Sequence, residues 1–248
     1  MFKQITLATV VTLSAVGAAQ ASTVSGNFSG TIDAPSDASG SSIAYIGAGT
    51  STLAWGTQSD GSSTVQTGDA SSLTINSTSF DFDAVALSTG SILLGTITWD
   101  NQSNFSAGGD WTSAINLDIN ISAPSSVSLS ETVAFGISNT TDTYRDTDEN
   151  ERLGTVPDLI TGLILDADAF SAPIDLGNGY LINSLFFAEI GTGNTFNDLT
   201  GLWTNVEGGV STIGIYAEVA PIPLPAGIWL MLGGLGSFAA IRRRKKAA

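Results

Sequence analysis

The sequence contains no cysteine and no histidine among its 248 residues. Without cysteine the chain forms no disulfides, so a folded body depends on its apolar core or on a metal ion. Without histidine it lacks the usual base at neutral pH, the commonest metal ligand and the Ser-His-Asp type of site. Paired carboxylates remain as catalytic chemistry, but no motif singles out one pair, so we expect a protein that is not an enzyme.

Positive charge is also scarce outside the two ends of the chain. Between residues 22 and 218 the only cations are Arg145 and Arg152, against all 23 acidic residues, which gives this body a net charge of −21. Such a surface repels phosphate backbones, so we expect no nucleic-acid partner. The acidity favours divalent cations, and solubility alone is the alternative reason for it.

The N-terminal end has the pattern of an export signal. Lys3 precedes an apolar segment that closes on the small residues Ala19 and Ala21. This spacing fits the active site of signal peptidase, so we expect residues 1–21 to be a helical signal peptide that is removed before Ser22. The alternative is a short N-terminal anchor helix that stays attached.

The C-terminal end combines an uncharged run, residues 226–241, with the five cations of residues 242–246. As a helix the run spans about 24 Å, slightly less than the bilayer core of about 30 Å. The long cationic side chains can reach the headgroups, and their charge keeps that end in the cytoplasm. We expect a transmembrane helix over residues 226–241, with a buried core helix as the alternative.

The order of these C-terminal segments resembles the VPLPA-type PEP-CTERM sorting signal. The matching residues are Pro223, Leu224, Pro225 and Ala226, then the apolar run, then Arg242, Arg243 and Arg244. Ile222 stands where the family has valine. The resemblance implies that an exosortase removes this tail, residues 219–248, during export in a Gram-negative bacterium that makes extracellular polysaccharide. The inner membrane would then be an intermediate stop before the cell surface or extracellular matrix.

The body between the two ends reads as β-strands. Residues 115–122 alternate apolar and polar side chains, which is the period of a strand with one face on a core. Residues 92–94 and 185–187 are apolar at consecutive positions, which predicts central strands covered on both faces. Short strands separated by Gly, Ser, Thr, Asn and Asp predict one all-β domain over residues 22–218, a β-sandwich or jelly roll.

The body also resembles the choice-of-anchor K domain. The segments that carry this resemblance are Trp55-Gly56, Ser72-Leu73-Thr74-Ile75, Leu94-Gly95-Thr96-Ile97-Thr98 and Ile215-Tyr216-Ala217-Glu218-Val219. Members often carry Thr-His-x-Asn-Asn-Pro where this chain has Thr98-Trp99-Asp100-Asn101-Gln102. The resemblance implies a domain that occurs with interchangeable sorting signals and has no known catalytic activity.

An acidic loop, residues 142–151, holds the candidate metal ligands. These are Asp142, Asp146, Asp148 and Asn150, whose oxygens suit calcium. Asp146, Asp148 and Asn150 alternate like the start of an EF-hand, but Glu151 stands where that motif needs glycine. A calcium site between sandwich loops is therefore one interpretation, and a solvated acidic loop is the other.

Aromatic and polar side chains lie close together in the sequence around residues 99–111. The candidate sugar ligands there are Trp99, Asp100, Asn101 and Trp111. Indole rings stack on the apolar faces of sugars, while amides and carboxylates bind their polar edges. The alternative is that both indoles pack in the core.

Taken together, these patterns predict an exported, non-catalytic structural or adhesive protein of an extracellular polysaccharide matrix. Its expected partners are signal peptidase, an exosortase, the membrane through the C-terminal helix, and exopolysaccharide. The alternative function is a carbohydrate-binding module, with calcium as a candidate cofactor.

Overall fold

The computed structural model describes residues 23–37, 45–56, 70–83, 90–102, 110–123, 126–138, 143–145, 151–153, 157–165, 173–177, 180–190, 195–206 and 208–222. All regular structure within these ranges is strand, which confirms the predicted all-β body. The two predicted terminal helices, residues 1–21 and 226–241, lie outside the described residues. Within the described part of the chain, no helix meets the length and hydropathy needed to span a bilayer.

The strands form two large sheets and one small hairpin, and the described pairs are antiparallel. Sheet A has the order β15 (Thr195–Asn197), β16 (Leu202–Asn205), β12 (Asp158–Thr161), β9 (Val127–Ser138), β8 (Trp111–Ala123), β1 (Thr23–Ile32) and β6 (Thr78–Asp83), with β2 (Ser36–Asp37) beside β8. Sheet B has the order β13 (Ile174–Gly177), β14 (Tyr180–Glu189), β17 (Gly209–Pro221), β7 (Gly90–Asn101), β5 (Ser71–Asn76), β4 (Thr52–Trp55) and β3 (Tyr45–Ile46). The hairpin pairs β10 (Thr143–Arg145) with β11 (Glu151–Leu153).

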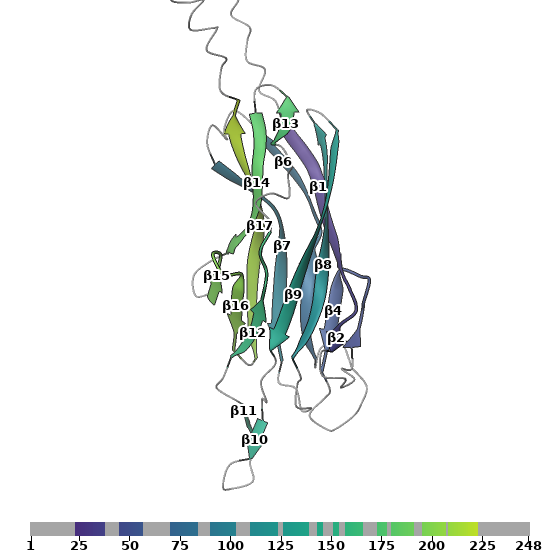
Figure 1. Ribbon diagram of the computed structural model, residues 1–248, viewed down its shortest axis with the longest axis vertical. Helices are drawn as coiled ribbons and strands as arrows, with labels where there is room; N and C mark the ends of the chain where they lie inside the picture. The colour runs from purple at the N-terminus through teal and green to yellow at the C-terminus, as the bar shows by residue number, and fades with distance from the viewer. Residues whose placement is uncertain are drawn as a thin grey trace, which may run out of the picture.

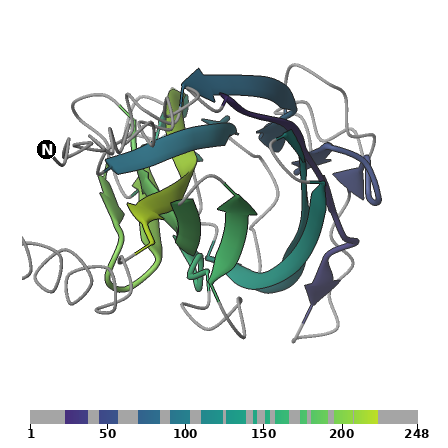
Figure 2. The ribbon, with the colours of Figure 1, turned by 90° about the horizontal axis from the view of Figure 1, so that it is seen from above.

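The two sheets face each other across one apolar core, an arrangement consistent with a β-sandwich. The long strands follow the long axis of the body in Figure 1, and Figure 2 shows the sheets curving toward each other when seen from above. Along β8, Ile115, Leu117 and Ile119 are buried, whereas Asn116 and Asp118 accept hydrogen bonds from β9 hydroxyls on the outer face. The alternation predicted over residues 115–122 is therefore the one that builds sheet A.

Two pairs of tryptophans join the sheets inside the core. Trp55 of sheet B meets Trp111 of sheet A edge to face, with ring centroids 5.2 Å apart. Trp99 of sheet B meets Trp203 of sheet A in the same way, at 5.4 Å. All four rings are at most 2% exposed. Edge-to-face pairs add about 0.5–1.5 kcal/mol each to the free energy of area burial, so these rings help fix how the sheets pack.

Candidate functional site

The structure places three of the four predicted sugar ligands, Trp99, Asn101 and Trp111, in the core rather than around a ligand site. Trp99 and Trp111 lie in opposite sheets, and each packs edge to face against a different tryptophan. Their ring faces meet core atoms instead of solvent, which is the packing arrangement named above as the alternative. Asp100 is partly buried and accepts a hydrogen bond from the Gln102 side chain.

Asn101 is fully buried and ties the two sheets together at one end of the body. Its Nδ2 donates to the carbonyl oxygen of Asn205 at 3.1 Å, and its Oδ1 lies 3.3 Å from Ser71 Oγ. The Asn205 side chain in turn donates to the carbonyl oxygens of Trp99 and Gly209 at 3.1 and 2.9 Å. Asn101 therefore has the hydrogen bonding of a residue that joins β7 to β16, with its amide directed inward.

The other predicted sites fall outside the described residues. They are the candidate calcium ligands Asp142, Asp146, Asp148 and Asn150, and the processing residues Ala19, Ala21, Pro223, Leu224, Pro225, Ala226, Arg242, Arg243 and Arg244. Among the residues that the structure describes, no group of three or more acidic side chains could hold a metal ion. The calcium and processing predictions thus remain predictions.

The prediction that residues 92–94 and 185–187 are covered on both faces is wrong for one residue in each run. Leu93 is 37% exposed while Ile92 and Leu94 are buried. Phe186 is partly exposed while its two neighbours, Leu185 and Phe187, are buried. The consecutive apolar residues therefore mark two places where an apolar side chain reaches the outer face of sheet B.

Two β-bulges explain why these side chains point outward. In β7, Ile215 pairs with Gly95 and the next residue, Tyr216, pairs with Leu93, so Leu94 is an extra residue. In β14, a similar shift between Ile182 and Ser184 leaves one extra residue. An extra residue reverses the side on which all later side chains fall, because side chains alternate along a strand.

The result is an apolar strip on the outer face of sheet B, formed by Phe186, Tyr216 and Leu93. These residues lie in register on three adjacent strands, β14, β17 and β7. The Phe186 and Tyr216 rings stack at 5.6 Å with planes only 16° apart. A Cβ built on Gly214 would overlap the Tyr216 ring and would lie 2.9 Å from the Leu93 side chain, so these two side chains meet above this glycine.

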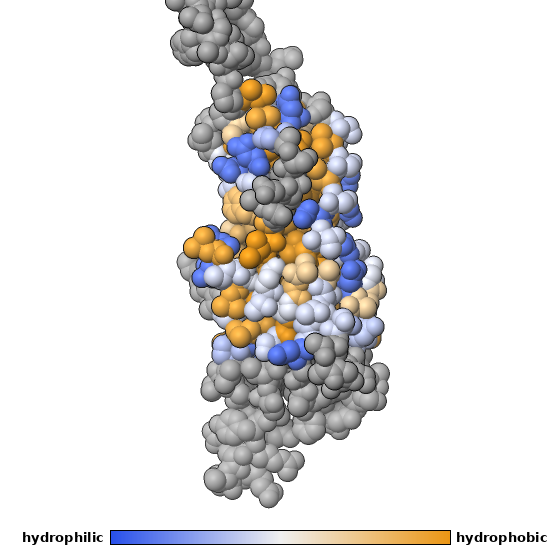
Figure 3. Space-filling view, in the orientation of Figure 1, coloured by the Kyte–Doolittle hydropathy of each residue, from blue (hydrophilic) through white to orange (hydrophobic). Residues whose placement is uncertain are grey.

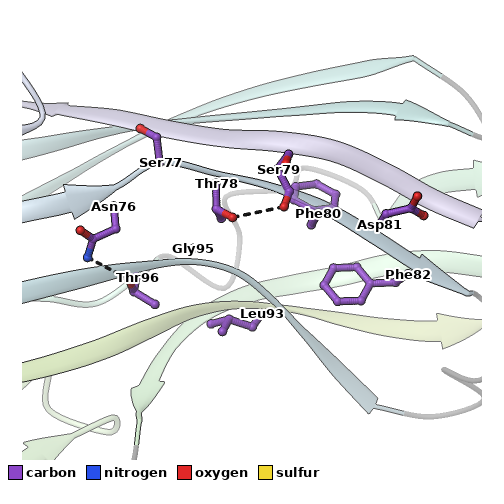
Figure 4. A pocket seen from close by; sticks show the side chains of 10 residues that line it. All are labelled: Asn76, Ser77, Thr78, Ser79, Phe80, Asp81, Phe82, Leu93, Gly95 and Thr96. Carbon is purple, nitrogen blue, oxygen red and sulfur yellow. Dashed lines mark hydrogen bonds between the residues drawn. The ribbon is translucent and has the colours of Figure 1, made fainter.

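The strip leads into a groove between the two sheets. The groove has a volume of about 640 Å³ and opens where the chain crosses from β5 of sheet B to β6 of sheet A at Ser77. Its apolar lining is Phe80, Phe82, Leu93 and Gly95, and its polar lining is Asn76, Ser77, Thr78, Ser79, Asp81 and Thr96. Figure 4 shows the Phe82 ring and Leu93 below β6, with Asn76 and Thr96 joined by a hydrogen bond of 2.9 Å at one end. The strip and the groove share Leu93 and form one continuous surface, which we call the strip–groove surface.

Other exposed hydrophobic residues are more scattered. Figure 3 shows hydrophobic and hydrophilic residues mixed on the face turned to the viewer. Leu199 is 87% exposed and Ile164 is 52% exposed, and neither of them lines the groove described above. Single exposed apolar residues are normal in folded proteins, so they give no evidence for a site.

Comparison with protein-family models and with curated proteins found no match for this chain. The resemblances to the sorting signal and to the choice-of-anchor K domain therefore rest on the residues quoted for them. The geometry alone selects the strip–groove surface as the candidate functional site.

Proposed function

We propose that this chain is an exported protein, sorted to the cell surface or extracellular matrix of a Gram-negative bacterium, with a non-catalytic structural or adhesive role among extracellular polysaccharides. The observation that carries the proposal is the order of proline-rich motif, apolar run and cationic end over residues 219–248. The proposed body, residues 22–218, is one β-sandwich or jelly-roll domain between a signal helix and a transmembrane helix. The strand β17 ends at Pro221, so residues 219–221 of the proposed tail belong to sheet B, and a cut after Pro221 would be compatible with removal of the rest of the tail from the folded body.

Mass spectrometry of the mature protein from its host tests this proposal. We expect a product that begins at Ser22 and lacks the C-terminal apolar run, because signal peptidase and an exosortase have acted. Replacing Arg242, Arg243 and Arg244 by Gln should leave an unprocessed form in the inner membrane. The matched control replaces the body cations Arg145 and Arg152 by Gln and should be processed normally. Recovery of the intact chain from the cytosol would refute the proposal.

A carbohydrate-binding module, with calcium as its candidate cofactor, is the second candidate function. The strip–groove surface favours it, because aromatic rings and hydroxyl groups border the same hollow. A protein of this class would hold matrix glycans without changing them. It would therefore share the proposed location and differ in having a defined ligand.

A further inference from the structure

The strip–groove surface has the length and composition of a site for an elongated ligand. The strip crosses three neighbouring strands, which lie about 4.8 Å apart, so it extends about 10 Å before it meets the groove. Three apolar side chains follow one another along it, and Phe82 continues the series inside the groove. A single sugar ring would cover only part of this surface, whereas a chain of several rings could contact all of it.

Polar groups border this apolar track on both sides. In the groove, Asn76 donates to Thr96 Oγ1 and Thr98 Oγ1, both at 2.9 Å, which holds its amide in a fixed orientation. Across the strip, Ser184 donates to a carboxylate oxygen of Glu218 at 3.0 Å on the exposed face. Apolar rings flanked by oriented amide, hydroxyl and carboxylate groups match the apolar faces and hydroxylated edges of sugar rings.

The charge of the surface selects among glycans. Of the described residues that line the groove, none is cationic, and the exposed carboxylate of Asp81 lies at its rim. Glu218 adds a second carboxylate beside the strip, and the surrounding body carries a net charge of −21 from its 23 acids and two cations. An acidic polysaccharide would therefore be repelled, while a neutral one loses nothing by approaching.

We propose that the strip–groove surface binds a neutral, linear polysaccharide, with Tyr216 and Phe186 as stacking residues and Asn76 and Thr96 as polar contacts. The proposal rests on the proposed matrix role, which places glycans around the protein. It goes beyond that role by naming the surface, the ligand class and the residues. Stacking on Tyr216 would use ring surface that is partly exposed and held in place above Gly214.

Binding of the full-length protein, kept in detergent micelles, to soluble β-glucan, mannan and xylan, with alginate as an acidic glycan for comparison, tests the proposal. We expect Tyr216→Ala and Phe186→Ala each to weaken binding to the preferred glycan about five- to tenfold, the effect of losing one aromatic contact. The matched control is Tyr45→Ala, which removes a 40% exposed tyrosine at the opposite edge of sheet B and should leave affinity unchanged. Thermal unfolding of each variant verifies the fold. Leu93→Asn, at an exposed position, serves as a second variant if an aromatic substitution impairs folding.

Three results would overturn the proposal. The first is no binding of the wild-type protein to any neutral glycan. The second is binding only to alginate or another acidic polysaccharide. The third is glycan or peptide binding that survives Tyr216→Ala and Phe186→Ala but is lost in Ser79→Pro, which would indicate that an extended chain pairs with the edge of β6. Correct export and processing alongside any of these results would leave the sorting proposal standing, and failed processing with intact glycan binding would do the reverse.

Discussion

Replacing Asn101 by Ala should destabilise the protein strongly, because this buried side chain joins the two sheets by hydrogen bonds. The substitution removes the hydrogen bond to the Asn205 carbonyl and the contact with Ser71 Oγ. Each hydrogen bond contributes about 1 kcal/mol, and the space left by the fully buried amide adds a cost of about 1 kcal/mol, because the surrounding core relaxes only in part. With Asn101 fully buried, we expect a loss of about 3 kcal/mol in the free energy of unfolding.

Thermal unfolding of the full-length protein, followed by near-UV circular dichroism, measures this loss. For a chain of this size, about 3 kcal/mol corresponds to a midpoint lowered by about 6–12 °C. The buried rings of Trp99 and Trp203 lie beside the network and report on the core at this end of the body. The matched control is Asn27→Ala on the outer face of β1, where one exposed hydrogen bond is lost and the change should stay within about 0.5 kcal/mol.

A midpoint for Asn101→Ala within about 1 °C of the wild type would refute the assignment of this residue to the core. It would show that the amide makes no net contribution to folding. The sugar-ligand interpretation of Asn101 would then regain support, because a group that does not stabilise the fold is available for another use.

Two further predictions concern packing and metal binding. Gly95→Val should lower the free energy of unfolding, measured by urea denaturation, by about 1–3 kcal/mol, because a side chain there would overlap the Phe28 ring. Gly90→Ala in the same strand, where a Cβ meets no atom within 4 Å, should be tolerated, and equal effects of the two changes would refute the reasoning. If the acidic segment, residues 142–151, binds calcium, the full-length protein should melt at a higher temperature in calcium than in chelator. An unchanged midpoint would remove calcium from the proposal.

The all-β fold could be predicted from the sequence because side-chain alternation is a local property. Residues 115–122 show this most clearly, since every second side chain is apolar and the strand β8 buries that set. Register across strands is not local. Thr52, Thr74 and Thr98 are separated by more than twenty residues each, yet they pair directly across β4, β5 and β7. Their hydroxyls pack as cross-strand neighbours, but the spacing of these three threonines along the chain does not predict that they pair.

The candidate site escaped sequence reasoning for a different reason. Tryptophan is the residue that a search for sugar platforms selects first, but a large ring is also the best filler between two sheets. Trp99 and Trp111 serve that second purpose. The two aromatic residues of the strip, Phe186 and Tyr216, lie far apart in the chain, in runs with the pattern of core strands.

The two bulges are what convert those core-like runs into a surface feature. Without the extra residue at Leu94, strict alternation counted from the buried Ile97 would turn Leu93 inward and Leu94 outward. Because of the bulge, Leu94 and Gly95 both face the core, and the Phe28 ring occupies the space that a side chain at Gly95 would need. These three features therefore depend on one another. The bulge at Leu94 turns Leu93 outward, and it also turns position 95 toward the Phe28 ring, where only glycine fits. The bulge places Leu93 beside Tyr216 and Phe186 on the outer face of sheet B, and this grouping of three apolar side chains, rather than one exposed leucine, points to a binding surface.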